Sequence, residues 1–384
     1  MGHCIHTAAM THCAKQRLVP LIVLLLAFSA QVHAKSWAVI ASSSRFWLNY
    51  RHTANVLGVY NSIKRLGIPD SRIVLMLADC SACDPRNPFP GQVLPSRSSA
   101  NLHSSSAEID YKDRDVSVES VMQVLTGHHP PGTPASRRLD SNSNSTVLLY
   151  LTGHGGDGFL KFHDQTELLA TDLAAAIKSM HCAGRYKELL LVLDTCQAAT
   201  LYSELDSVPN WAGIASSKLG QSSYALRSDP GVGAHLVDEF SHYLANYLDK
   251  ITPPVDKTLL TNKNKGRQSK TSVGPSIEQM LSIVRMNRMS SEIAVESSKL
   301  GRSLSDVKVL EFFGEYSGNS RGDCEDGWVK SGSIENLDRE RAVRNRDSKS
   351  SGRDLVTPSK QVESEDARSD YTASLHDMLL QAWP

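Results

Sequence analysis

Two residues whose side chains can do nucleophilic chemistry each stand just beyond an apolar run. His154 follows the run 146–151 in a Gly-His-Gly-Gly motif, and Cys196 follows the run 188–193 in an Asp-Thr-Cys-Gln motif. A cysteine needs a neighbouring base or cation to be largely thiolate near neutral pH, because its free pKa is about 8.5. The histidine is such a base, so the pair predicts a cysteine nucleophile activated by an imidazole.

The elements that carry this pair are predicted to be two buried strands joined by one helix, with Thr171 as its N-cap and Gly184 at its end. Parallel strands joined in this way end at the same edge of the sheet, where α/β proteins bind ligands. If the strands are neighbours, their spacing of about 5 Å brings the thiol and the imidazole within hydrogen-bond reach. The main-chain amides of Gly155 and Cys196 would then face a developing oxyanion.

Simpler explanations exist for both residues. A lone cysteine at a strand end is often a small buried hydrophobe, and a lone histidine among glycines is often a turn residue. Zinc binding is disfavoured, because no second cysteine or histidine lies at ligand spacing near either residue. Their matched positions, beyond two strands separated by one helix, favour the catalytic hypothesis.

The remaining apolar runs alternate with helical patterns, which predicts an α/β fold with a mostly parallel sheet. A helix is expected from about residue 50 to 66, and a polar, lysine-rich insertion loop at 253–271. One domain, residues 35–317, contains all of these elements. Its sheet is expected to have six strands, at residues 37–41, 73–77, 146–151, 188–193, 212–216 and 307–312.

The composition excludes several classes of protein. With 384 residues, of which 40% are hydrophobic and 21% charged, the chain is not a collagen, a coiled coil or a fully disordered protein. Its 41 basic residues balance 41 acidic ones, so nothing steers the whole chain towards nucleic acid or an anionic membrane surface.

Both ends differ from the domain between them. Residues 1–34 have the pattern of a secretory signal peptide, with Lys15 and Arg17, an uncharged apolar stretch at 18–30 and a small-residue cleavage site ending at Ala34. That stretch is shorter than the roughly 20 residues that a membrane span needs. The polar residues 318–384 are expected to form a disordered tail, so we expect no transmembrane helix in the mature chain.

A secreted chain meets an oxidising compartment, where cysteines pair. The cysteines outside the signal peptide are Cys80, Cys83, Cys182, Cys196 and Cys324. Their odd number means that at least one thiol is free, catalytic or bonded to another chain. Asn144 begins an Asn-Ser-Thr sequence, which is an N-glycosylation acceptor.

Motifs around the pair resemble the catalytic subunits of glycosylphosphatidylinositol (GPI) transamidases, a branch of the legumain-like C13 cysteine peptidases in the caspase-like clan. Gly-His-Gly is shared across the clan, whereas Asp-Thr-Cys-Gln and the Asn-Pro-rich stretch after Leu77 are typical of the transamidase branch. The resemblance covers about residues 36–315 and implies a caspase/legumain-like fold. Its other matching segments are residues 44–52, 67–70, 85–88, 125–127, 130–134 and 312–314.

The resemblance also assigns roles to individual residues. It implies that Cys196 is the nucleophile, His154 the general base and Asn49 the residue that orients the imidazole. Asn49 also suits the N-cap of the helix that begins at Tyr50, and the two roles are compatible.

Further residues acquire roles in the same way. Ser216 and Ser217 correspond to positions that line the substrate cleft. Cys83 corresponds to a cysteine that is disulfide-linked to a PIG-T-type partner subunit. A local pair of Cys80 with Cys83 stays open as an alternative, because Cys80 stands where relatives commonly carry Asp.

A structural calcium ion is a separate hypothesis. Glu108 and Asp110 alternate along an extended stretch, and with Asp70 they offer three oxygen donors of the kind that Ca²⁺ prefers. A solvated acidic face is the alternative. The chemistry predicted for the cysteine needs no cofactor.

The activity that the resemblance implies is acyl transfer in the endoplasmic reticulum lumen. The cysteine would cleave the C-terminal signal from a proprotein and hold a thioester, which the ethanolamine amine of a GPI lipid displaces. The implied partners are PIG-T-type and Gaa-type subunits, which would hold the chain at the membrane, as in the soluble trypanosomatid-type form that it resembles. A legumain-like asparaginyl endopeptidase and an inactive protease-fold scaffold are the competing functions.

Overall fold

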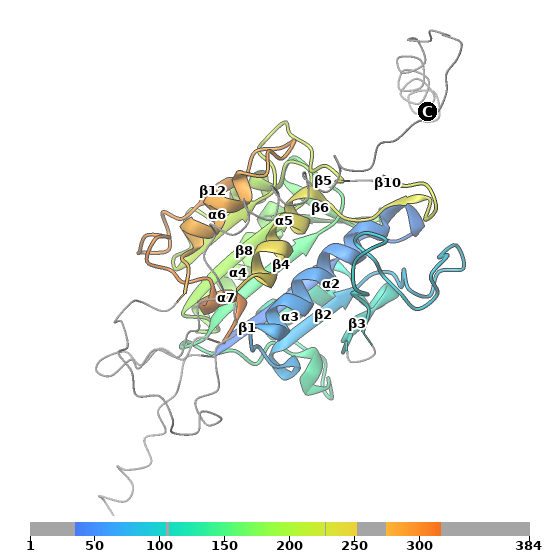
Figure 1. Cartoon of the computed structure of the whole chain (residues 1–384). Coiled ribbons are helices and arrows are strands. Elements are labelled where there is room, and N and C mark those ends of the chain that lie inside the picture. The colour runs from blue at the N-terminus through green and yellow to red at the C-terminus, as the bar shows by residue number, and fades with distance from the viewer. Residues whose placement is uncertain (1–34, 105–106, 227, 252–273, 316–384) are drawn as a thin grey trace, which may run out of the picture. The chain divides into compact units, whose positions relative to one another are not determined.

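A computed structural model describes residues 35–104, 107–226, 228–251 and 274–315 (Figure 1). These residues all belong to one compact unit. The predicted signal peptide at 1–34, the insertion loop at 253–271 and the tail at 318–384 lie outside the described residues.

The centre of the fold is a seven-stranded sheet with the order β12-β9-β8-β4-β1-β2-β3 (Figure 1). Neighbouring strands are parallel, except that β12 runs antiparallel to β9. The mostly parallel sheet predicted from the sequence is therefore confirmed. Its strands are β1 (Ser36–Ser42), β2 (Ile73–Leu77), β3 (Tyr111–Lys112), β4 (Thr146–Thr152), β8 (Glu188–Asp194), β9 (Trp211–Ala215) and β12 (Ala294–Glu296).

The central strands are continuous apolar runs because both faces of the sheet are covered. Alternate residues enter two different cores: Tyr150 and Val192 point into one, and Leu149 and Leu191 into the other. All four side chains are fully buried. Each such burial contributes roughly 1.5–3 kcal/mol to folding, so the strand ends that carry the site are held by a rigid core.

Helices supply both covering layers. The first core is completed by α2 (Tyr50–Arg65), α5 (Glu239–Asp249), α6 (Ile277–Arg285) and the short α7 (Leu310–Phe313). The second core is completed by α3 (Val118–Thr126) and α4 (Ala170–Cys182). Among the described residues, none of the helices combines the length and the apolar character that crossing a membrane requires.

Two small antiparallel sheets lie outside the central one. The first consists of β5 (Gly155–Gly156), β6 (Phe159–Phe162) and β7 (Thr166–Leu169), and it follows β4 directly. The second pairs β10 (Ser228–Asp229) with β11 (Ala234–His235).

Two details of the predicted fold are wrong. Residues 307–312 do not form a strand, because their apolar side chains enter the first core from a loop and from α7, and a short apolar run does not distinguish these cases. The antiparallel edge strand is β12 instead, and with β3 the strands number seven rather than six. Thr171 is not an N-cap, since β7 runs directly into α4 and Leu169 holds that position.

Candidate active site

The loops that carry the predicted pair leave neighbouring strands at the same edge of the sheet. β4 and β8 are parallel and in register, with Thr152 opposite Asp194. His154 and Cys196 each follow two residues later, on adjacent loops. The adjacency of strands on which the sequence argument depends is therefore confirmed. Cys196 is a half-buried free cysteine.

A glycine allows these loops to approach each other closely. A Cβ atom at Gly155 would lie 2.5 Å from Thr195 Oγ1 and 2.6 Å from the main-chain oxygen of Phe159. Both distances are shorter than real side chains tolerate, so a larger residue would push the loops apart. The Gly155 backbone thus lies beside Thr195, the residue that precedes Cys196, and the oxyanion role of the two amides stays a prediction.

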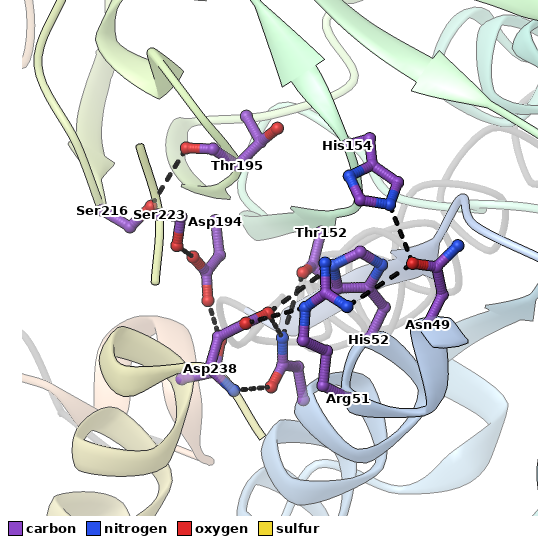
Figure 2. Close-up of polar contacts among 12 residues, drawn as sticks. Asn49, Arg51, His52, Thr152, His154, Asp194, Thr195, Ser216, Ser223 and Asp238 are labelled. Carbon is purple, nitrogen blue, oxygen red and sulfur yellow. Dashed lines mark hydrogen bonds and ion pairs between the residues drawn. The ribbon is translucent and has the colours of Figure 1, made fainter. Parts of the chain in front are cut away.

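The imidazole of His154 contacts the predicted orienting residue (Figure 2). Its Nε2 lies 2.8 Å from Oδ1 of Asn49. The Asn49 Nδ2 donates to the main-chain oxygen of Arg45 at 2.7 Å, which assigns the amide oxygen to the imidazole side. Nε2 must then carry the ring proton, and Nδ1 is the basic nitrogen. Asn49 is the N-cap residue of α2, as predicted, but its side chain makes no capping hydrogen bond.

The surroundings favour a neutral imidazole. Burial lowers the pKa of His154, and the positive charge of Arg51 lowers it further. A second ring, that of His52, lies edge-on to His154 with 5.1 Å between ring centroids. Burial, with Arg51, lowers the pKa of His52 well below its ordinary value. The site therefore holds His154 in the form that can accept a proton from a thiol.

A largely buried charge pair lies next to the orienting residue (Figure 2). The Arg51 Nε lies 3.1 Å from the carboxylate of Asp238, and its Nη1 donates to Asn49 Oδ1 at 3.5 Å. Asp238 also accepts a 2.6 Å hydrogen bond from Nδ2 of Asn55, which in turn contacts Thr152 Oγ1 at 3.2 Å. These contacts tie the first two turns of α2 to the end of β4 and to the segment before α5.

Sequence reasoning missed this charge pair. Arg51 lies in the segment 44–52 that carries the family resemblance, which was the available signal. Asp238 had none, because it is 183 residues from its hydrogen-bond partner Asn55. Burial, with the negative charge of Asp194, raises the pKa of Asp238 to about 7, although Arg51 acts in the opposite direction.

The aspartate of the Asp-Thr-Cys-Gln motif anchors the nucleophile loop. Asp194 is the last residue of β8 and is 1% exposed. Its carboxylate accepts hydrogen bonds from the hydroxyls of Ser223, at 2.6 Å, and Ser241. Ser241 also bonds the hydroxyl of Tyr150. Asp194 therefore fixes the end of β8, two residues before Cys196.

The two serines predicted to line the substrate cleft have a different place. Ser216 and Ser217 are both fully buried. The hydroxyl of Ser217 donates to the main-chain oxygen of Thr195 at 2.7 Å and accepts from the amide of Ala198 at 3.1 Å. Because these atoms brace both sides of Cys196, the serines support the nucleophile loop and do not face an open cleft.

Two predictions concern covalent modification. Cys80 and Cys83 form a disulfide with each other, which is the local alternative. This finding goes against the intersubunit bond assigned to Cys83, since the local bond would have to open first. Cys182 is a free, exposed cysteine on α4. Asn144 is exposed, as a glycosylation acceptor must be, and its modification stays a prediction.

The three carboxylates proposed for calcium do not fit a metal site. Lys64 Nζ lies 2.6 Å from the Asp70 carboxylate and neutralises it. Asp110 accepts the main-chain amide of Leu75 at 2.9 Å, and burial, with nearby Glu108 and Asp70, raises its pKa to about 6. The part of the chain that the structure describes contains no group of three His, Cys, Asp or Glu side chains able to hold a metal.

Fold and site together define a protein of the cysteine-peptidase type, with a histidine, an asparagine and a free cysteine at the carboxyl edge of a mostly parallel sheet. The family model described as the Peptidase C13 family matches residues 36–277. The chain therefore belongs to the peptidase C13 family.

Individual relatives agree with this assignment. The chain is 42% identical over 308 residues to the "GPI-anchor transamidase" of Schizosaccharomyces pombe, covering 77% of this chain and 75% of that protein. It is 49% identical over 222 residues to the "GPI-anchor transamidase" of Homo sapiens, covering 58% of this chain. That alignment spans 56% of the human protein's length. Among solved structures, caspase-1 of Spodoptera frugiperda matches with a TM-score of 0.40 at 13% identity, covering 75% of this chain and 93% of that one.

Proposed function

We propose that this chain is the catalytic subunit of a GPI transamidase, acting in the endoplasmic reticulum lumen. The observation that carries the proposal is the register of β4 and β8, which brings the loops of His154 and Cys196 to one edge of the sheet. The printed names of the relatives in S. pombe and human supply the substrate class.

The first half of the reaction makes an acyl-enzyme. The thiol of Cys196 gives its proton to Nδ1 of His154, and the sulfur attacks the carbonyl carbon of the attachment residue in a proprotein. The amides of Gly155 and Cys196 bind the oxyanion of the tetrahedral intermediate. When the peptide C–N bond breaks, the imidazolium returns the proton to the leaving amine of the C-terminal signal. A thioester on Cys196 remains.

The second half transfers the acyl group. The ethanolamine amine of a GPI lipid attacks the thioester carbonyl, and His154 removes a proton from the attacking nitrogen. The C–S bond breaks, the thiolate of Cys196 takes up the proton, and the proprotein is joined to the lipid by an amide. Water in the same place would give hydrolysis, so exclusion of water around the thioester decides between the two outcomes. PIG-T-type and Gaa-type subunits are the proposed partners that bring proprotein and lipid together.

The test is rescue of cells depleted of this chain, with GPI-anchored protein at the cell surface as the readout. Wild type is expected to restore the surface protein, and Cys196→Ala and His154→Ala are expected not to. Cys182→Ala is the matched control, because it removes the exposed free thiol on α4 and leaves the catalytic edge unchanged. Rescue by Cys196→Ala would indicate an inactive scaffold. Cleavage of small asparagine-containing peptides by the isolated chain would indicate an asparaginyl endopeptidase.

A further inference from the structure

A hollow lies at the opposite end of the parallel strands from the catalytic loops. It has a volume of about 290 Å³ and is formed by the turn after α3, at residues 127–133, with Arg138, Asp140 and Arg185. Arg185 lies three residues before β8, whereas Cys196 lies two residues after it. A seven-residue strand at about 3.3 Å per residue separates the two places by roughly 20 Å, so this hollow is not part of the active site.

The hollow contains buried nitrogen atoms without hydrogen-bond partners. Within the described residues, neither ring nitrogen of His129 has a partner, and the same is true of Nε of Arg138. Buried polar atoms are normally hydrogen-bonded, because leaving them unpaired costs about 1–3 kcal/mol each. These nitrogens have almost no exposed surface, so a ligand reaches them only through a small shift of the wall, and the exposed part of the Arg138 side chain is the group that it contacts first.

The third cationic group is held rigidly in the wall. Arg185 donates from Nε to the main-chain oxygen of Leu125 at 2.9 Å and from Nη2 to that of Leu139. A Cβ at Gly127 would lie only 2.4 Å from Arg185 Nη1, so the guanidinium packs directly on the turn. The group is pre-organised, which reduces the entropy lost when a ligand binds.

The charges of the hollow favour an anion. Two guanidinium groups face one carboxylate, that of Asp140, which lies 3.7 Å from Arg138. Burial lowers the pKa of His129, and Arg185 and Arg138 lower it further against the opposing effect of Asp140. His129 is then largely neutral and can gain a proton when a negative charge enters the hollow.

Backbone groups of the turn contribute little to such a site. The amides of Gly127, His129 and Thr133 donate to main-chain oxygens within the chain. Pro130 and Pro131 have no amide proton. Side chains must therefore recognise the ligand, and planar guanidinium groups are suited to the paired oxygens of phosphate.

We propose that this hollow is a binding site for a phosphate group carried by a small molecule. Its volume of about 290 Å³ is close to the lower limit of small-molecule pockets, roughly 300–1,000 Å³, which leaves room for the group that bears the phosphate. The proposal does not depend on the proposed transamidase activity, because none of its residues belongs to the catalytic edge.

Inorganic phosphate and glycerol phosphate are the probes, titrated into the full chain against chloride at equal ionic strength, with calorimetry as the readout. Arg138→Gln is expected to raise the Kd about tenfold, since it removes one charged contact. Arg114→Gln is the matched control, because Arg114 is exposed and lies outside the hollow. Arg185 is left unchanged, because its hydrogen bonds support the end of α3. Glycerol phosphate is expected to bind more tightly than inorganic phosphate, and the reverse order would overturn the proposal that a small molecule carries the phosphate.

Sulfate separates a specific site from general attraction of anions, because its charge does not change between pH 5 and 8. Wild type is expected to bind sulfate more tightly as pH falls, since a protonated His129 adds a positive charge to the hollow. His129→Gln is expected to lose this dependence. Equal Kd values for wild type, Arg138→Gln and Arg114→Gln would overturn the proposal, and so would a pH dependence that survives His129→Gln.

Discussion

Asn49→Ala should separate the chemistry of the site from the stability of the fold. The substitution removes the 2.8 Å contact to Nε2 of His154. When the imidazole becomes imidazolium during the reaction, that contact is a charge-assisted hydrogen bond, worth about 1.5–3 kcal/mol. At 1.36 kcal/mol for each factor of ten, kcat/KM should fall about 10- to 100-fold.

Stability should respond much less to the same change. Asn49 makes no capping hydrogen bond to α2, so truncation leaves the helix start intact. The loss of the contact with the Arg45 main-chain oxygen should cost about 1 kcal/mol, or a decrease of roughly 2–4 °C in Tm. Asn61→Ala is the matched control, because it removes a similar amide contact, to the Leu102 main-chain oxygen, from the same helix. It should keep full activity.

The assay is transfer of the acyl group of a substrate peptide to hydrazine, a small amine that intercepts a thioester, followed from pH 5 to 9. Asn49→Asp adds a sharper test, since a carboxylate beside Nε2 raises the pKa of His154. The rate of that variant should fall most at acidic pH and recover as pH rises. Wild-type rates and an unshifted pH profile in both Asn49 variants would refute the orienting role.

Three further perturbations test the surroundings of the site. Gly155→Ala should destabilise the fold by about 1–3 kcal/mol and lower activity at least tenfold, because its Cβ meets the nucleophile loop; Gly58→Ala, whose Cβ would meet only Ala245 Cβ at an ordinary 3.5 Å, should keep activity, and equal losses would contradict this account. Because burial raises the folded pKa of Asp238 to about 7 from an ordinary 3.8, its contribution to the free energy of unfolding falls as pH rises from about 4 to about 7. Asp238→Asn should therefore flatten the decline of Tm over that range in scanning calorimetry, and an unchanged slope would count against it. Cys80→Ala removes the disulfide that closes a small loop, at a cost to stability on the order of 2 kcal/mol or less, and leaves Cys83 with a free thiol. On non-reducing gels, a band linked to a partner should then appear only in the variant. The same band in wild type would show an intersubunit bond.

The central sheet was predictable because strands that are buried on both faces appear in the sequence as continuous apolar runs. β4 and β8 are covered on both faces, so every residue in them is buried and the runs are continuous. The edge strands β3 and β12 show no continuous apolar run, because they have only two and three residues and are partly exposed. Residues 307–312 are apolar for a different reason, as part of a core-facing loop and helical turn, and pattern alone does not separate that case from a strand.

The same distinction applies to the site. His154 and Cys196 each follow a buried strand. Once the sheet is known to be parallel, their positions in the sequence place both residues at its carboxyl edge. The contacts behind them depend on tertiary packing, which joins Asn55 to Asp238 across 183 residues. The serines after β9 show the limit of analogy, because their position at a strand end did not reveal that their hydroxyls point back into the nucleophile loop.

The choice of an amide at position 49 follows from the base that the proposed transfer needs. In the second half-reaction His154 must take a proton from an attacking amine, and a carboxylate in direct contact would raise the pKa of the imidazole and favour its protonated form. The amide oxygen of Asn49 orients the ring without adding a full charge. The carboxylate of Asp238 does not contact the imidazole through Asn49 but pairs with Arg51. The positive charge of Arg51 lowers the pKa of His154. An Asp at position 49 is therefore not equivalent to Asn for this chemistry, although the two side chains have nearly the same shape.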